Sequence, residues 1–131
     1  MDNQNKKILI VEDDQFLREF YQELLTAEGY NVDTAGQGEI ALSKIQNNEY
    51  DLLLLDIMLP KKDGVQILKD LKVKGPRSQD LIIVVLTNLG QDLIIKECFD
   101  LGAEGYLIKS ALSPDQVLAE VKSYLEKTPN G

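Results

Sequence analysis

The sequence predicts an α/β fold in which five parallel strands alternate with five helices in a doubly wound sheet. Three of the five apolar runs are continuous rather than alternating, which is typical of strands buried on both faces. Strands that alternate with helices form parallel sheets through right-handed crossovers, which place helices on both faces. The five runs are ILIV at 8–11, NVDTA at 31–35, LLLL at 52–55, LIIVVLT at 81–87 and GYLIK at 105–109.

Apolar residues three or four positions apart predict a helix after each strand. In the first helix Phe16, Phe20 and Leu24 recur every four residues, and Gly29 follows as a stop signal. The second helix contains Ala41 and Ile45. The third contains Ile67, Leu68 and Leu71 and ends near Gly75 and Pro76. The fourth extends from Leu93 to Leu101 and is closed by Gly102.

The fifth helix completes a chain of single-domain size. It begins at SPDQ, where Ser113 is expected to be the N-cap and Pro114 the first helical residue. Its apolar residues are Val117, Val121, Tyr124 and Leu125.

With 131 residues, the chain is expected to form one domain over 1–131, with its core at 6–127 and loose pieces at both ends.

Charge and hydropathy argue against several classes of protein. The net charge is −8 and no basic stripe is visible, so direct nucleic-acid binding is not expected. No apolar run approaches the roughly 20 residues needed to cross a bilayer. The N-terminal segment MDNQNKK lacks the apolar region of a signal peptide. We therefore expect a cytoplasmic protein that does not bind membranes.

The residue types present also limit the chemistry. The chain has no histidine, which excludes Ser-His-Asp triads and ordinary zinc sites. The absence of histidine also means that this chain cannot be the phosphohistidine partner in a phosphotransfer. The single cysteine, Cys98, excludes an internal disulfide and lies in the apolar stretch LIIKECF. We expect a buried, inert thiol, with a reactive thiol as the alternative.

Polar residues end four of the five predicted strands. Asp13 and Asp14 end the first, Asp56 the third, Thr87 the fourth and Lys109 the fifth. Ligands of such sheets bind beyond the carboxyl ends of the strands, near the point where the strand order reverses. Carboxylates crowded at this rim repel one another, and Mg²⁺, which is usually held by one or two carboxylates, would remove the repulsion. This pattern favours a magnesium site over a full calcium cage.

Each of these residues also has an ordinary structural explanation. Asp13 or Asp14 could N-cap the helix that follows, and Asp56 could belong to a turn. Thr87 suits a strand as a β-branched residue, and Lys109 could be a solvated surface amine. The functional interpretation rests on all five residues falling at one rim of the same predicted sheet.

Four segments of the chain resemble a known family. In order and spacing, ILIVEDD, DLLLLDIMLPKKDG, IIVVLT and GAEGYLIK are similar to the response-regulator receiver domain of bacterial two-component signalling, in particular its single-domain, chemotaxis-regulator-like members. The resemblance extends over about residues 6–127 and implies a flavodoxin-like fold with strand order 2-1-3-4-5. It also implies a phosphorylation-controlled switch that catalyses only its own phosphorylation and dephosphorylation.

The resemblance implies a phosphorylation site that contains Mg²⁺. Asp56 resembles the phospho-acceptor, whose carboxylate takes a phosphoryl group from a phosphohistidine and forms an acyl phosphate. Asp14 resembles the acid that contacts the metal directly, and Asp13 the one that holds it partly through water. Asp56 itself and the backbone carbonyl of Met58 complete the implied ligand set. The implied donor is a sensor histidine kinase or a histidine phosphotransfer protein.

The resemblance also implies a switch that reaches a partner-binding face. Lys109 resembles the amine that pairs with the phosphoryl oxygens, and Thr87 the hydroxyl that moves to bond them. Tyr106 resembles the aromatic residue that turns inward when the threonine moves. The implied output face comprises the fourth helix, fifth strand and fifth helix, which would bind a downstream protein or a second copy in a weak dimer.

The fourth helix carries a separate sign of such a face. Leu93, Ile94 and Ile95 follow one another and cannot all face the core, because a core stripe uses spacings of three and four. We expect at least one of them to be exposed at a partner or dimer face. Loose packing against a loop is the alternative.

Several residues depart from the family pattern. Asn88 stands where the family has a small residue and narrows access to the site. Ser110 follows Lys109 where the family often has a proline, so a trans bond or a strained loop is expected there. Met58 and Leu89 are apolar at positions that influence attack by water, which predicts slow self-dephosphorylation.

Other functions remain open from the sequence alone. One is a magnesium-dependent phosphohydrolase with an aspartate nucleophile, although such enzymes carry a D-x-D pattern on the first strand. Another is a pseudo-receiver, a binding module that is not phosphorylated. Within the receiver interpretation, the chain is a stand-alone switch whose output is protein contact, a phosphorelay intermediate, or one domain of a larger regulator.

Overall fold

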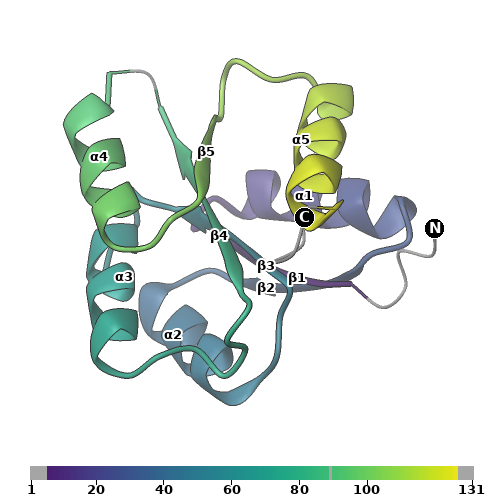
Figure 1. The fold of residues 1–131 in the computed structure, drawn as a ribbon. Helices are drawn as coiled ribbons and strands as arrows, with labels where there is room; N and C mark the ends of the chain where they lie inside the picture. Colours follow the sequence, from purple (N-terminus) through teal and green to yellow (C-terminus); the bar gives the residue numbers. More distant parts are fainter. Residues whose placement is uncertain (1–5, 89, 127–131) are drawn as a thin grey trace.

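The computed structural model of the chain describes residues 6–88 and 90–126, in which strands and helices alternate without exception (Figure 1). This order confirms the predicted alternation. The elements are β1 (Lys7–Val11), α1 (Gln15–Ala27), β2 (Asn31–Ala35), α2 (Gly38–Asn47), β3 (Leu52–Asp56), α3 (Gly64–Val73), β4 (Ile82–Thr87), α4 (Asp92–Asp100), β5 (Gly105–Ile108) and α5 (Pro114–Glu126).

The strands form one parallel sheet in the order β2-β1-β3-β4-β5, which confirms the predicted fold class and strand order. β1 pairs with β2 on one side and with β3 on the other, so the strand order reverses at β1. In the second of these pairs Ile8 lies opposite Leu52 and Val11 opposite Leu55. The carboxyl ends of β1 and β3 therefore lie side by side, at the position where open α/β sheets bind ligands.

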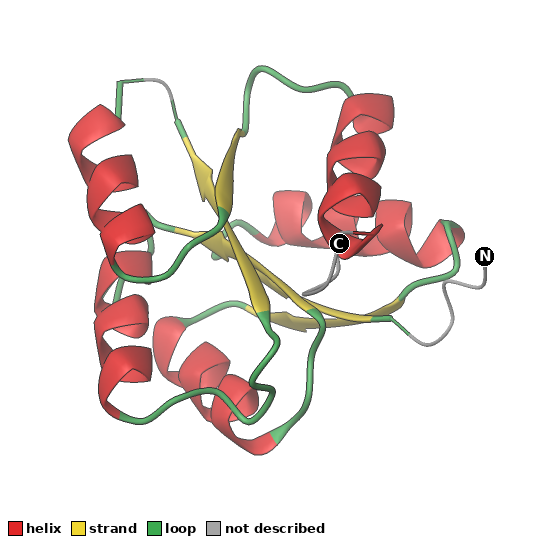
Figure 2. Ribbon diagram, in the orientation of Figure 1, coloured by secondary structure: helices red, strands yellow, loops and turns green. Residues whose placement is uncertain are grey.

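Helices cover both faces of the sheet (Figure 2). Successive strand residues point to opposite faces, so Leu53 and Leu55 enter one core while Leu52 and Leu54 enter the other. Helices α2, α3 and α4 pack on the first core, and α1 and α5 pack on the second. Burial on both faces explains why β3 reads as a continuous apolar run.

The helix boundaries follow the predicted start and stop signals. The Gln116 amide donates to Ser113 Oγ at 3.3 Å, and the Ser113 amide donates to Gln116 Oε1 at 2.8 Å, which is a reciprocal capping box. Pro114 is the first residue of α5. Gly29 and Gly102 follow α1 and α4 with φ of 99° and 112°, a conformation that favours glycine.

The buried face of α1 differs in part from the predicted stripe of Phe16, Phe20 and Leu24, of which only Leu24 packs against the core. Tyr21 and Leu25 face the core, whereas Phe16 is 78% exposed and Phe20 is also exposed. Leu17, Tyr21 and Leu25 have the same four-residue spacing as Phe16, Phe20 and Leu24, so periodicity alone cannot choose between the stripes. The direction in which α1 leaves the sheet decides which stripe is covered.

Two predictions about α4 are confirmed. Leu93 is 85% exposed, as expected of one residue in the apolar triplet, while Ile94 packs against the core. Cys98 is fully buried, and burial, aided by the nearby acids Glu97 and Asp63, raises the pKa of its thiol to about 11. Such a thiol stays protonated and unreactive at neutral pH.

No helix within residues 6–88 and 90–126 is long and apolar enough to cross a membrane.

Candidate functional site

Three carboxylates meet where β1 and β3 end. Val11 closes β1, and Glu12 and Asp13 follow it directly, while Asp56 is the last residue of β3. Carboxylate oxygens of these three residues, hereafter the acid group, all lie within 4.8 Å of one another. Such a cluster of hard oxygen ligands fits a small divalent cation, because the ion offsets their mutual repulsion.

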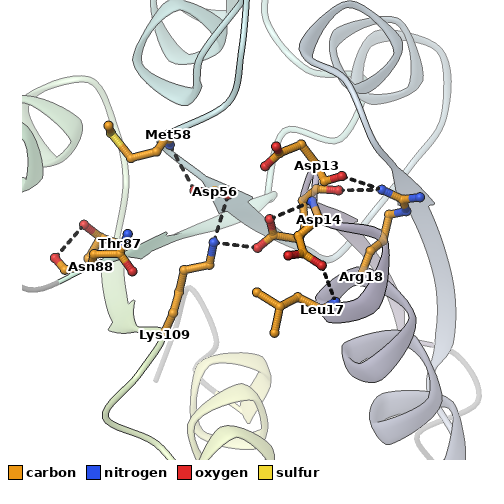
Figure 3. Close-up of polar contacts among 10 residues, drawn as sticks. Asp13, Asp14, Leu17, Arg18, Asp56, Met58, Thr87, Asn88 and Lys109 are labelled. Atoms are coloured by element: carbon orange, nitrogen blue, oxygen red, sulfur yellow. Dashed lines mark hydrogen bonds and ion pairs between the residues drawn. The ribbon is translucent and has the colours of Figure 1, made fainter.

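Lys109 reaches the acid group from the end of β5. Its Nζ lies 2.9 Å from Asp56 Oδ2 and 2.7 Å from Glu12 Oε1 (Figure 3). The Lys109 amide donates to the Thr87 carbonyl at 2.8 Å, which extends the β4–β5 pairing by one step and directs the chain along the rim. The structure therefore brings Lys109 and Asp56 together as the sequence predicted.

The Asp56 carboxylate is held on both of its oxygens. Oδ2 accepts from Lys109, and Oδ1 accepts from the Met58 amide at 2.9 Å. The residue is 2% exposed. Behind it, Gly64 packs so closely that a Cβ there would lie 2.9 Å from the Asp56 carbonyl oxygen and 2.7 Å from Ile57 Cα. The start of α3 thus fixes the backbone that carries Asp56.

Glu12 is the acid whose titration is most perturbed. It is 1% exposed, and burial raises its pKa from 4.5 to about 7; Lys109 opposes this shift, and the negative charge of Asp56 adds to it. Its Oε2 accepts from the Asp14 amide at 3.1 Å, while its Oε1 contacts Lys109 as an ion pair without hydrogen-bond geometry. For Lys109, burial disfavours the charged form, but the two carboxylates outweigh it and raise the pKa.

Asp14 lies outside the acid group. Its Oδ1 accepts from the Leu17 amide at 3.1 Å, so the side chain caps the N-terminus of α1 (Figure 3). Of the pair expected at the metal, the structure brings Asp13 to the site and assigns Asp14 the capping role that was its alternative. Sequence reasoning did not assign Glu12 to the site. The sequence feature that could have identified Glu12 is its position as the first acid after the buried strand.

The residues implied to switch lie on the neighbouring strands. Thr87 is fully buried at the end of β4, and its hydroxyl donates to the Asn88 carbonyl at 3.2 Å. Tyr106 on β5 is 43% exposed and meets the ring of Phe99 from α4 edge to face, with centroids 6.3 Å apart. Thr87 thus lies at the end of the strand that pairs with β3, whereas Tyr106 is exposed beside Phe99 of α4.

The positions that depart from the family pattern are also placed. The Lys109–Ser110 bond is trans, because residues 6–88 and 90–126 contain no cis peptide bond, and this agrees with the expectation. Asn88 and the Met58 side chain are exposed at the rim. Leu89 lies outside the described residues, so its part in the hypothesis on dephosphorylation remains a prediction.

Comparisons with known proteins identify the family. Residues 8–122 match the family described as the response regulator receiver domain. The chain is 38% identical over 126 residues to the alkaline phosphatase synthesis transcriptional regulatory protein PhoP of Bacillus subtilis, which covers 95% of this chain and 50% of that protein. The chain thus spans about half the length of the curated relatives it matches.

Solved structures give the same assignment. A CheY-like response regulator receiver domain protein from Methanospirillum hungatei superposes with a TM-score of 0.82 at 30% identity, covering 92% of this chain and 94% of that one. The response regulator TrrA of Thermotoga maritima, solved in complex with Mg²⁺-BeF, gives 0.77 at 34% identity, covering 91% and 98%. The chain therefore belongs to the response regulator receiver domain family, whose members are phospho-accepting parts of two-component signalling systems.

Proposed function

We propose that the chain accepts a phosphoryl group on Asp56 and that this modification changes the face through which it binds a downstream protein. The observation that supports this most directly is the 2.9 Å contact between Lys109 Nζ and Asp56 Oδ2 beside two further acids. A half-buried lysine shared by Asp56 and Glu12 suits a site that must stabilise additional negative charge.

The proposed step is an in-line transfer. A carboxylate oxygen of Asp56 attacks the phosphorus of a phosphohistidine on a donor protein and forms an O–P bond. The P–N bond of the donor breaks, and its electron pair stays on the imidazole nitrogen. Because phosphoryl transfer has a loose transition state, positioning and charge compensation do most of the work, and Lys109 supplies positive charge at the phosphoryl oxygens.

The acid group suits Mg²⁺ as the second source of positive charge. We propose Asp13, Asp56 and the Met58 carbonyl as its protein ligands, with Glu12 beside them and with Asp14 as the helix cap. When bound, Mg²⁺ offsets negative charge on the carboxylates and on the phosphoryl oxygens. The structure of TrrA with Mg²⁺-BeF supports this proposal by analogy within the family.

The change of binding face is proposed to start at Thr87. Its hydroxyl now donates to its neighbour Asn88, and a phosphoryl group on Asp56 would offer it stronger, charged acceptors. Movement of Thr87 would free space beside β5 and allow the exposed Tyr106 ring to leave Phe99 and turn inward. The face formed by α4, β5 and α5, with Leu93 at its surface, would then change shape.

The proposed partners follow from this cycle. The chain has no histidine, so the phosphohistidine belongs to a sensor kinase or to a histidine phosphotransfer protein. We propose that the output is contact with a protein, made as a monomer or a weak dimer through the α4-β5-α5 face. The transcriptional role in the name of the Bacillus relative describes that longer protein.

Incubation with acetyl phosphate and Mg²⁺, followed by intact-protein mass spectrometry, tests this proposal. We expect a single phosphoryl adduct on the wild type and none on Asp56→Asn. Asp80→Asn is the matched control, because this exposed acid lies just before β4, away from the rim where the acid group lies. An adduct on Asp56→Asn, or rapid hydrolysis of acetyl phosphate by the wild type with no adduct accumulating, would contradict the proposal. The second outcome would indicate a phosphohydrolase.

A further inference from the structure

We propose that Arg18 is a positioning residue, which holds the loop after β1 in the conformation that binds the divalent cation. The inference rests on the magnesium site of the proposed function and extends it to a residue outside the acid group. Arg18 lies on the first turns of α1, immediately after the segment that carries Glu12, Asp13 and the capping Asp14.

One side-chain nitrogen of Arg18 reaches two successive backbone carbonyls. Nη1 donates to the Glu12 oxygen at 2.9 Å and to the Asp13 oxygen at 3.3 Å (Figure 3). The backbone amide of Arg18 donates to the next carbonyl, that of Asp14, at 2.9 Å. A single residue thus contacts the carbonyls of three consecutive acids, two of which belong to the acid group.

The chain leaves room for this contact at Gly36, which follows β2. A Cβ at residue 36 would lie 2.8 Å from Arg18 Nη1, closer than real Cβ atoms approach without a shift, and 3.3 Å from Arg18 Cζ. Gly36 does not have a positive φ, so its backbone conformation does not itself require glycine. Glycine therefore differs from alanine at residue 36 because an alanine Cβ would occupy the space of the Arg18 guanidinium.

Charge and positioning make opposite predictions for the loss of Arg18. A guanidinium near the acid group repels a second cation, so its removal would strengthen Mg²⁺ binding if charge alone mattered. The guanidinium donates to carbonyls, however, and so orders the loop before the ion arrives. If the loop is not ordered in advance, Mg²⁺ binding must also order it, and this loss of conformational entropy lowers the Mg²⁺ affinity. The sign of the change in Mg²⁺ affinity therefore separates the two explanations.

Isothermal titration of Mg²⁺ into the unphosphorylated full chain measures that sign. We expect Arg18→Ala to weaken Mg²⁺ binding about tenfold, the low end of the range for groups that orient metal ligands. Arg77→Ala is the matched control, because it removes the same charge from an exposed residue whose nearest acid, Glu49, lies 3.9 Å away. Arg77→Ala should leave the Mg²⁺ affinity unchanged.

Gly36→Ala tests the same contact from the opposite side. It keeps Arg18 but displaces its guanidinium, so it should also weaken Mg²⁺ binding. In the Arg18→Ala background it should have no further effect, because the group that it displaces is already absent. Gly75→Ala is the control for a neutral glycine change, because a Cβ there meets only the Leu71 carbonyl at 3.9 Å.

The outcomes distinguish this inference from the function on which it rests. If the wild type binds Mg²⁺ and Arg18→Ala binds it equally or more tightly, the positioning role is overturned while the magnesium site stands. If the wild type does not bind Mg²⁺ at all, the magnesium site itself fails, and the inference fails with it. Urea denaturation of each metal-free variant completes the experiment, since a general loss of folding would lower affinity and stability together.

Discussion

Lys109 pairs with a carboxylate that is almost completely removed from water, since its Nζ lies 2.7 Å from Oε1 of Glu12, which is 1% exposed. Lys109 Nζ also lies 2.9 Å from Asp56 Oδ2, so one positive charge is shared by two buried acids. Burial of a carboxylate whose negative charge is only partly balanced costs free energy, and the raised pKa of Glu12 reflects this cost. The site is thus prepared to accept another cation.

Glu12→Gln should flatten the dependence of stability on pH in the metal-free protein. Folding raises the pKa of Glu12 from 4.5 to about 7, so the folded state binds the proton more tightly than the unfolded state. The free energy of unfolding should therefore fall as pH rises through this interval, by at most about 3 kcal/mol. No histidine titrates in the same window.

Urea denaturation in a chelator between about pH 5 and 8 checks this dependence. The wild type should lose stability toward the upper end, and Glu12→Gln should lose much less. Equal slopes for the two proteins would show that Glu12 titrates normally in the folded chain.

Gly64→Ala should destabilise the protein and disturb the backbone of Asp56. The added Cβ would meet Ile57 Cα at 2.7 Å and the Asp56 carbonyl at 2.9 Å, and neither backbone atom can move independently of β3. Overpacking of this kind typically costs about 1–3 kcal/mol. In Gly75→Ala the added Cβ would make only an ordinary van der Waals contact, at 3.9 Å from the Leu71 carbonyl oxygen. This variant should therefore be as stable as the wild type, or more stable, in the same denaturation experiment. Equal stabilities of the two variants would refute the close approach at Gly64.

Substitution of the exposed Phe16 in α1 should cost much less stability than truncation of the buried Leu25. Phe16→Gln should change the free energy of unfolding by no more than about 0.5 kcal/mol, because the side chain is largely in water. Leu25→Ala should cost about 2–5 kcal/mol, because it leaves a cavity against the sheet. Thermal or urea unfolding compares the two variants, and a larger loss for Phe16→Gln would mean that the helix packs on its other face.

The phosphorylated chain should lose its phosphoryl group slowly. The exposed Met58 side chain lies next to the site and has no polar group able to orient an attacking water. Met58→Asn should therefore speed the decay without removing phosphorylation. Decay can be followed by intact mass after removal of acetyl phosphate, and loss from the wild type within seconds would contradict the prediction.

Periodicity and boundary signals were sufficient to predict the elements and the parallel α/β class, whereas the strand order was implied by the family resemblance. Continuous apolar runs such as Leu52 to Leu55 require cover on both faces, and the alternation of strands with helices leaves a parallel sheet as the natural solution. The cap at Ser113 and the stop at Gly102 were predicted because they depend on local geometry, which neighbouring residues decide.

The site was predicted less completely, because three acids follow β1 and sequence does not say which of them turn toward β3. Asp14 was expected at the metal, but its side chain caps α1, while Glu12 points into the acid group. The choice depends on where the strand ends and on how the loop is held, one residue at a time. The capping acid Asp14 and the buried acid Glu12 are only two positions apart.

What the sequence determined by itself was the set of elements, their order and the rim at which the chemistry gathers, since these follow from short-range patterns and from the rule that parallel strands end at one edge. Only the tertiary structure decided which stripe of α1 is buried and which acids face Lys109. The first depends on how α1 packs on the sheet and the second on how the loop after β1 is held, and both involve contacts between residues far apart in the chain.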